Sequence, residues 1–471
     1  MAAITAGFTV YIATAAERIE HVPPQTEFSK PATDPSSSVE TEAALARVNA
    51  ARSRADADPL ALEDALTALG DALLKAGQYA SAEAAYAEAL RRAEQHGGPD
   101  SERVLAPLLG LGNTFAGSGH HQEAVVLLQR AVAITRAQHG LFDRGQQDTL
   151  KTLAGSLTTL GRLREAQDLM IYRVRIAEKV YHEGSPKVIP VLCELGDWFA
   201  EVGRSVEARM TFQVALNIVG ATPSLNAPII VEPLRGIART YMRRQSYPET
   251  WLTASNSPAR WARRSRAIVV DPAPADCSAP GQECRPPSRT DSGGKPIVGT
   301  RELNREGEYA LQKALRILEG DPSASTQTRI ETLIQMGDWY QIKKSPREAL
   351  LYYQRAWQLI RTASSLPSSA TTALNVPLRV YYPTPEIVAH APAVPGEETR
   401  SNYVQIEFTV AADGSVQDAR IVDHDTRERY ARDIFDAIRA SRFRPKFVDG
   451  QAVATPGITY REVFWTSKPR E

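Results

Sequence analysis

The sequence repeats itself with a period of 42 residues. Five pairs of an apolar residue and a small residue share this spacing: Leu69-Gly70, Leu111-Gly112, Leu153-Ala154, Leu195-Gly196 and Ile237-Ala238. A second large side chain follows each apolar residue after four positions, and in the first four units a glycine follows after eight. Glycine is the residue at which helices commonly end. Alanines and large residues then continue at helical spacing. Each unit is therefore predicted to be a helix, a glycine-containing turn and a second helix, stable only when stacked on its neighbours.

The fifth unit is interrupted by an insertion at about residues 245–300, which is rich in proline and glycine. Its first helix is predicted to continue through Tyr241, and its second helix resumes near Leu311 and Ala314. A sixth unit begins at Met336-Gly337. The pattern therefore predicts six units over residues 60–362.

The order of large residue, glycine, aromatic residue, turn and alanine resembles the tetratricopeptide repeat. Its usual unit is about 34 residues long, and a longer form with extended helices also occurs in that family. The resemblance implies a concave groove lined by the first helix of each unit. The side chains two positions after each large apolar residue would face this groove: Asp71, Asn113, Asp197, Arg239 and Asp338. The three acids predict a preference for a basic or amide-rich peptide, and a solvated groove without a ligand is the alternative.

The period changes beyond a predicted linker at residues 363–376. Val404, Ile406, Phe408 and Val410 alternate as on a strand, and Asp413-Gly414 is a hairpin signal. A return strand, a helix and a last strand follow. The whole chain is thus predicted to be α+β, an α-helical repeat solenoid followed by a small β-β-α-β domain at residues 377–465.

This carboxy-terminal region resembles the carboxy-terminal domain of TonB-family proteins. The resemblance is carried by the strand at residues 404–410, the Asp413-Gly414 turn, the Arg442-Phe443-Arg444-Pro445 stretch and Asp449-Gly450. In that family the domain lies in the periplasm and binds a segment of an outer-membrane receptor as an added strand. The resemblance implies a protein or peptide partner of that kind, bound at the last strand, and the predicted edge residues are Ile458, Thr459, Tyr460, Arg461 and Phe464.

The amino terminus leaves the cellular location open. Residues 1–16 carry no charged side chain and are too few to span a bilayer as a helix. They are predicted to be a secretory signal or a partial membrane anchor, with a flexible terminus as the alternative, and residues 17–59 form a linker and a lead-in helix. We expect the protein to lie in the periplasm or the cell envelope, with the cytoplasm as the alternative. Any membrane association would occur through this segment.

Charge gives no global attraction to nucleic acid, because 55 Lys and Arg residues balance 55 Asp and Glu residues. The stretch from Arg235 to Arg266 contains eight arginines and one acidic residue, Glu249. A solvated face is favoured there over a nucleic-acid or other anion-binding patch.

No phosphate-binding loop, zinc-binding helix or nucleophile elbow is present in the sequence. We therefore predict no catalytic residue, no metal ligand, no cofactor and no small-molecule substrate. Cys193 is predicted to be a buried, inert thiol. Cys277 and Cys284 could close a small loop in an exported protein, whereas two unpaired thiols are favoured in a cytosolic one. The sequence favours a non-enzymatic interaction scaffold of the cell envelope over a TonB-type energy transducer, a cytosolic repeat adaptor or a nucleic-acid binder.

Overall fold

The computed structural model describes most of the chain as two compact units, Met1–Val188 and Ile189–Glu471. The described residues are 35–53, 59–222, 227–244, 300–363, 366–367, 370, 372–383, 385, 388 and 399–467. The predicted amino-terminal segment at residues 1–16 and the cysteines Cys277 and Cys284 lie outside them. No helix within the described ranges is long and apolar enough to cross a bilayer.

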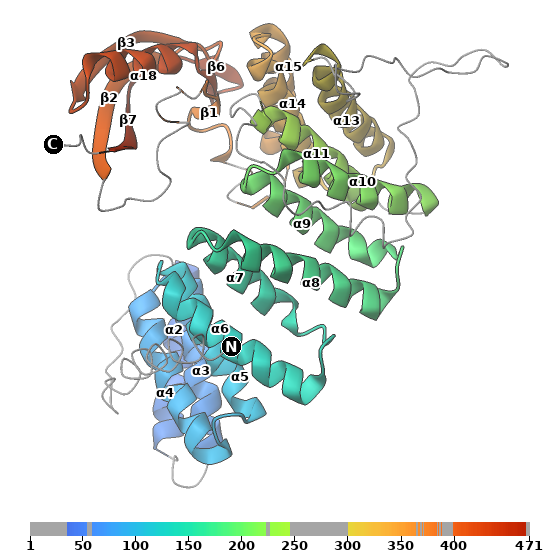
Figure 1. Cartoon of the computed structure of the whole chain (residues 1–471), viewed down its shortest axis with the longest axis vertical. Coiled ribbons are helices and arrows are strands. Elements are labelled where there is room, and N and C mark those ends of the chain that lie inside the picture. The colour runs from blue at the N-terminus through green and yellow to red at the C-terminus, as the bar shows by residue number, and fades with distance from the viewer. Residues whose placement is uncertain are drawn as a thin grey trace. The chain divides into compact units, whose positions relative to one another are not determined.

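The first unit consists of antiparallel helix pairs (Figure 1). Its elements are α2 (Pro35–Arg52), α3 (Pro59–Lys75), α4 (Tyr79–Gly97), η1 (Glu102–Val104), α5 (Leu105–Gly117), α6 (His121–His139), α7 (Gln146–Thr159), α8 (Leu163–Tyr181) and η2 (Pro186–Val188). Gly77 and Gly119 separate the helices of the first two pairs and have positive φ angles of 70° and 86°. A side chain at either position would strain the turn, which explains why glycine is found there. The observed order of helix, glycine-containing turn and helix confirms this part of the repeat prediction.

The glycines of the repeat make room for a large side chain of the second helix. Tyr86 of α4 is fully buried, and a Cβ atom added to Gly70 of α3 or Gly110 of α5 would overlap its ring. The tyrosine of one second helix thus lies between the first helices of two successive repeats. Phe212 takes the same position in the second unit. The 42-residue spacing therefore places an aromatic ring and its matching glycines in register.

The second unit continues the helix pairs. Its array helices are α9 (Ile189–Glu201), α10 (Ser205–Ala221), α11 (Ala227–Arg244), α13 (Thr300–Gly320), α14 (Thr326–Ile342) and α15 (Pro346–Thr362). Helix α11 packs against α13, which follows the insertion in sequence. Val231 and Leu234 of α11 share a buried cluster with Ala314 and Leu318 of α13. The interrupted fifth repeat is thus completed across the insertion.

The strands of the second unit follow the array. They are β1 (Leu378–Tyr381), β2 (Thr399–Val410), β3 (Val416–His424), β4 (Arg442–Arg444), β5 (Lys446–Val448), β6 (Gln451–Val453) and β7 (Thr455–Ser467), with helix α18 (Glu428–Ala440) after β3. Three of them form an antiparallel sheet in the order β3-β2-β7, while β1 pairs with β4 and β5 with β6. The core between this sheet and α18 contains Val404, Ile406, Ile434 and Ile438, all fully buried.

The region is more elaborate than the predicted β-β-α-β unit. The sequence did not predict β1, β4, β5 or β6, which are only three or four residues long. Such short segments hold too few residues to display the two-residue alternation of a strand. The predicted linker at residues 363–376 also contains Leu374, which is 1% exposed and packs in one core with Tyr353 and Phe447.

Candidate functional site

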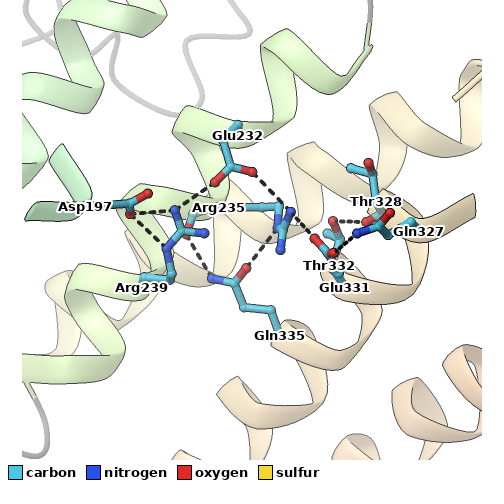
Figure 2. A network of polar contacts seen from close by, with 9 residues as sticks. All are labelled: Asp197, Glu232, Arg235, Arg239, Gln327, Thr328, Glu331, Thr332 and Gln335. Atoms are coloured by element: carbon cyan, nitrogen blue, oxygen red, sulfur yellow. Dashed lines mark hydrogen bonds and ion pairs between the residues drawn. The ribbon is translucent and has the colours of Figure 1, made fainter. Parts of the chain in front are cut away.

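Two of the predicted groove residues bind each other in the second unit. Arg239 of α11 places Nη2 2.7 Å from Oδ1 of Asp197 in α9 and 2.8 Å from Oε1 of Glu232 (Figure 2). Burial alone would lower the pKa of Arg239, but Asp197 and Glu232 outweigh it and raise the pKa, so the guanidinium stays charged. The ion pair joins the first helices of two successive repeats one period apart.

The same network extends from α11 to α14. Nη1 of Arg235 lies 3.1 Å from Glu232 and 2.9 Å from Glu331, and Gln335 donates to the Arg235 carbonyl at 2.9 Å (Figure 2). Two of the eight arginines of the basic stretch are therefore already matched by carboxylates. The rest of that stretch, apart from the end of α11, lies outside the described residues.

Asp338, predicted to face an open groove, is instead covered by the carboxy-terminal region. Arg444 of β4 donates from Nε to Oδ1 of Asp338 at 2.9 Å and from Nη2 to Oδ2 at 2.5 Å. The Tyr353 hydroxyl also donates to Oδ1, at 2.7 Å. Burial and the nearby Asp338 raise the pKa of Tyr353, so its hydroxyl remains a donor. Asp338 is therefore an internal contact in this structure.

Other contacts hold the same two parts of the second unit together. Gln341 of α14 donates to the carbonyl of Asp413 at 2.9 Å, and Arg444 donates to the carbonyl of Ala373 at 3.2 Å. The ring of Phe447 meets that of Tyr353 edge to face. The Arg-Phe-Arg-Pro stretch thus packs on the last repeat, a role that its sequence alone did not reveal.

The groove positions of the first unit are exposed. Asp71 of α3 accepts a 2.6 Å hydrogen bond from the Tyr86 hydroxyl, and Asn113 of α5 also faces solvent. Beside Asp71 lies a cavity of about 320 Å³ between α3, α4 and the η1–α5 segment. Its lining residues are Glu63, Asp64, Thr67, Ala68, Asp71, Ala89, Ala93, Glu102, Arg103, Ala106 and Pro107.

The charge of this cavity is predominantly negative. Four carboxylates line it against one guanidinium, that of Arg103. Glu63 is buried and accepts from Arg103 Nε at 3.2 Å, while its other oxygen lies 2.5 Å from His96 Nδ1. Asp64 and Asp71 are exposed. Sequence reasoning missed Asp64, although it lies seven residues before Asp71 and so shares its helical face.

The last strand, β7, presents the second predicted site. Phe464 is 2% exposed, and Ile458 and Tyr460 pack against the same core, whereas Thr459 and Arg461 are exposed. Among the described strands, β7 pairs with β2 on one side only. It therefore lies at an edge of the three-stranded sheet.

The two edges of this sheet differ in regularity. The pairing of β2 with β3 shifts register twice, and Asp418 of β3 has a φ of 50°. The pairing of β2 with β7 keeps one register from Thr399 to Phe408 and shifts once, before Val410. Bulges obstruct the addition of another strand. The regular edge of β7 is thus the better template for pairing.

Comparison with known proteins identifies the first two repeats. Residues 62–137 match the tetratricopeptide repeat family model, and they span α3 to α6. The repeat resemblance is confirmed there, and such repeats support a role in protein–protein interaction. No curated protein matches the sequence. The resemblance to TonB-family proteins stays a prediction.

Solved structures with similar helices are only distantly related. BtubC (BKLC) from P. vanneervenii is 18% identical, with 54% of this chain and all of that chain covered and a TM-score of 0.38. A kinesin light chain with nearly identical TPR-like repeats from Podosopora anserina is 22% identical, with 38% and 84% covered and a TM-score of 0.34. At these TM-scores the similarity carries no conclusion about function.

Proposed function

We propose that the protein is a non-enzymatic scaffold that binds peptide or protein partners at two surfaces. The first surface is the acidic groove beside Asp71 and Asn113, and the second is the edge of β7. The observation that carries the proposal is the open cavity within the stretch that matches the tetratricopeptide family. A cavity of about 320 Å³ is at the small end of ligand sites, which suits one or two side chains of a peptide.

The edge of β7 is proposed to bind a partner segment as an added strand. Support comes from its pairing on one side only among the described strands, its regular register and its alternation of inward and outward side chains. On the outward face, the Arg461 guanidinium lies 3.7 Å from the centroid of the Tyr403 ring, and Val463 is 53% exposed. Added strands bind mainly through backbone hydrogen bonds, so few particular side chains are required.

Proline substitution in β7 tests this surface. Thr459→Pro and Arg461→Pro each remove one backbone donor and leave the inward-facing side chains in place. Amides two residues apart on a regular strand point to the same edge, so both variants should weaken capture of partners from envelope extract. Thr459→Ala and Arg461→Ala are the matched controls and should retain capture. Circular dichroism must show that every variant is folded. Undiminished capture by both folded proline variants would exclude strand addition at this edge.

The location is proposed to be the periplasm or the cell envelope, on the resemblance of residues 377–465 to the TonB family. An envelope partner, such as a receptor segment, then follows from the family's mode of binding. Alkaline phosphatase fused after residue 471 tests the location, since this enzyme needs the oxidising periplasm. Activity supports export, whereas an inactive but intact fusion supports the cytosolic adaptor. Resistance of the exported fusion to high-salt extraction would favour an anchored energy transducer over a soluble scaffold.

A further inference from the structure

Two aspartates at equivalent repeat positions each accept a hydrogen bond from an equivalent tyrosine. Asp71 follows Gly70 and accepts from the hydroxyl of Tyr86 at 2.6 Å, and Asp338 follows Gly337 and accepts from Tyr353 at 2.7 Å. In both cases the tyrosine lies 15 residues later, and its ring packs against the glycine before the aspartate. The hydroxyl bonds Oδ1 each time and so orients the carboxylate. The first and last repeats thus contain two copies of one acceptor.

The copy in the last repeat already holds a ligand group from the chain itself. The guanidinium of Arg444 bonds both oxygens of Asp338, at 2.9 Å and 2.5 Å. This is a bidentate arrangement in which the planar fork of an arginine matches a carboxylate. The structure therefore displays what this Asp–Tyr pair binds when a second chain segment crosses it.

The copy in the first repeat is exposed. Within the described residues, Asp71 accepts its hydrogen bond from the Tyr86 hydroxyl. Asp71 borders the acidic cavity, where Ala68 of α3 and Ala106 of α5 provide apolar surface. An arginine combines an apolar stem with a charged head, so it suits a cavity with this lining.

The geometry points to Asp71 as the acceptor for an arginine side chain of a partner protein, received as Asp338 receives Arg444. The inference rests on the proposed scaffold function and specifies the chemistry of its partner. Lysine would be the weaker ligand because an ammonium group is a point charge that cannot form the two parallel bonds. The remaining carboxylates would attract any cation, whereas the oriented Asp71 would select the guanidinium.

Binding of peptide pools to the full chain tests the inference. The probes are fluorescein-labelled heptapeptides with a fixed central arginine, lysine or citrulline and uncharged random residues elsewhere, measured by fluorescence anisotropy. Citrulline has nearly the shape of arginine without its charge. We expect the arginine pool to bind at least tenfold more tightly than the citrulline pool and several-fold more tightly than the lysine pool.

Variants of the cavity separate the oriented acceptor from general attraction. Asp71→Asn should remove the preference for arginine, and Tyr86→Phe should reduce it. Asp64→Asn and Glu102→Gln remove the same charge from the same cavity and should keep most of the preference. Asp71 and both control residues are exposed, so these variants are expected to fold.

Each other outcome overturns the inference. Equal binding of the three pools would exclude arginine recognition but leave the scaffold function standing. If Asp71→Asn and Asp64→Asn lose the preference for arginine equally, the cavity attracts cations without recognising the guanidinium group. If no pool binds, the groove is not a peptide site, and the scaffold proposal then depends on β7 alone.

Discussion

The Arg444 guanidinium and the Asp338 carboxylate form a bidentate ion pair between residues 106 positions apart. Each side chain is only 11% exposed. Burial alone would lower the pKa of Arg444, but the adjacent Asp338 raises it by more, so the guanidinium remains charged. The pair fixes the β4 strand on α14, the first helix of the last repeat.

Removal of one partner of this pair should destabilise the second unit strongly. Asp338→Ala or Arg444→Ala leaves the other charge buried without its counterion, which costs about 3 to 5 kcal/mol of unfolding free energy. The measurement is urea denaturation followed by tryptophan fluorescence, since Trp339 is 1% exposed on α14. Arg355→Ala is the matched control because its pair with Glu319 is exposed, and it should cost less than about 1 kcal/mol.

A double-mutant cycle checks that the two residues act together. The loss in the double variant Asp338→Ala/Arg444→Ala should be well below the sum of the single losses. Simple additivity would mean that the pair does not join β4 to α14 in solution.

The repeat register predicts large effects at buried leucines. Leu111 is completely buried and Leu195 is 1% exposed. Leu→Ala at either position should lower the unfolding free energy of its unit by about 2 to 5 kcal/mol, because a cavity replaces packed atoms. Asn113→Ala, exposed on the same helix as Leu111, is the control for denaturation experiments. If both Leu→Ala variants lower the unfolding free energy by less than about 1 kcal/mol, the predicted repeat register is wrong.

The Cys193 thiol should be unreactive in the native protein. It lies buried in α9, and burial, together with the nearby carboxylates of Glu232 and Asp197, raises its pKa. Reaction requires the thiolate, so an aromatic disulfide reagent should label it only after unfolding. The experiment uses the Cys277→Ser/Cys284→Ser background, in which Cys193 is the one remaining cysteine. Rapid labelling under native conditions would show that α9 opens locally.

Alkaline pH should weaken the carboxy-terminal sheet through Tyr460. Burial and a hydrogen bond to Glu462 raise the pKa of Tyr460 to about 12, from an ordinary value of about 10. The native state thus keeps its proton to a higher pH than the unfolded chain. This stability contribution is complete below about pH 10 and is lost as the pH rises through about 12. Tyr460→Phe should show a shallower fall in unfolding free energy over this range, and an identical slope would contradict the assignment.

The array was predictable because its determinants are local and periodic. Leu111, Gly119 and Ala124 have equivalents at fixed offsets in the first four repeats, and a buried ring such as Tyr86 requires small residues at known distances. The alternation of β2 likewise identifies its buried face. These signals depend on neighbours within a few turns or one repeat.

The partner of Asp338 could not be predicted in the same way. Its position in the repeat resembles that of Asp71, and only the folded chain shows that Arg444 reaches Asp338. A contact between residues so far apart in sequence depends on how the strand region packs against α14. The short ladders of β1 with β4 and β5 with β6 depend on that packing too, since three residues have little strand preference of their own.

The packing of α11 against α13 has a consequence for how the array can be extended. Both ends of residues 245–299 lead into helices that complete one repeat, and Arg235 contacts Glu331 beyond them. The entropy of closing a loop grows slowly with its length, by about 0.6 kcal/mol for each doubling. Within this repeat the chain therefore has a natural insertion point, where an additional folded module would be carried as a side branch without interrupting the stack of helices.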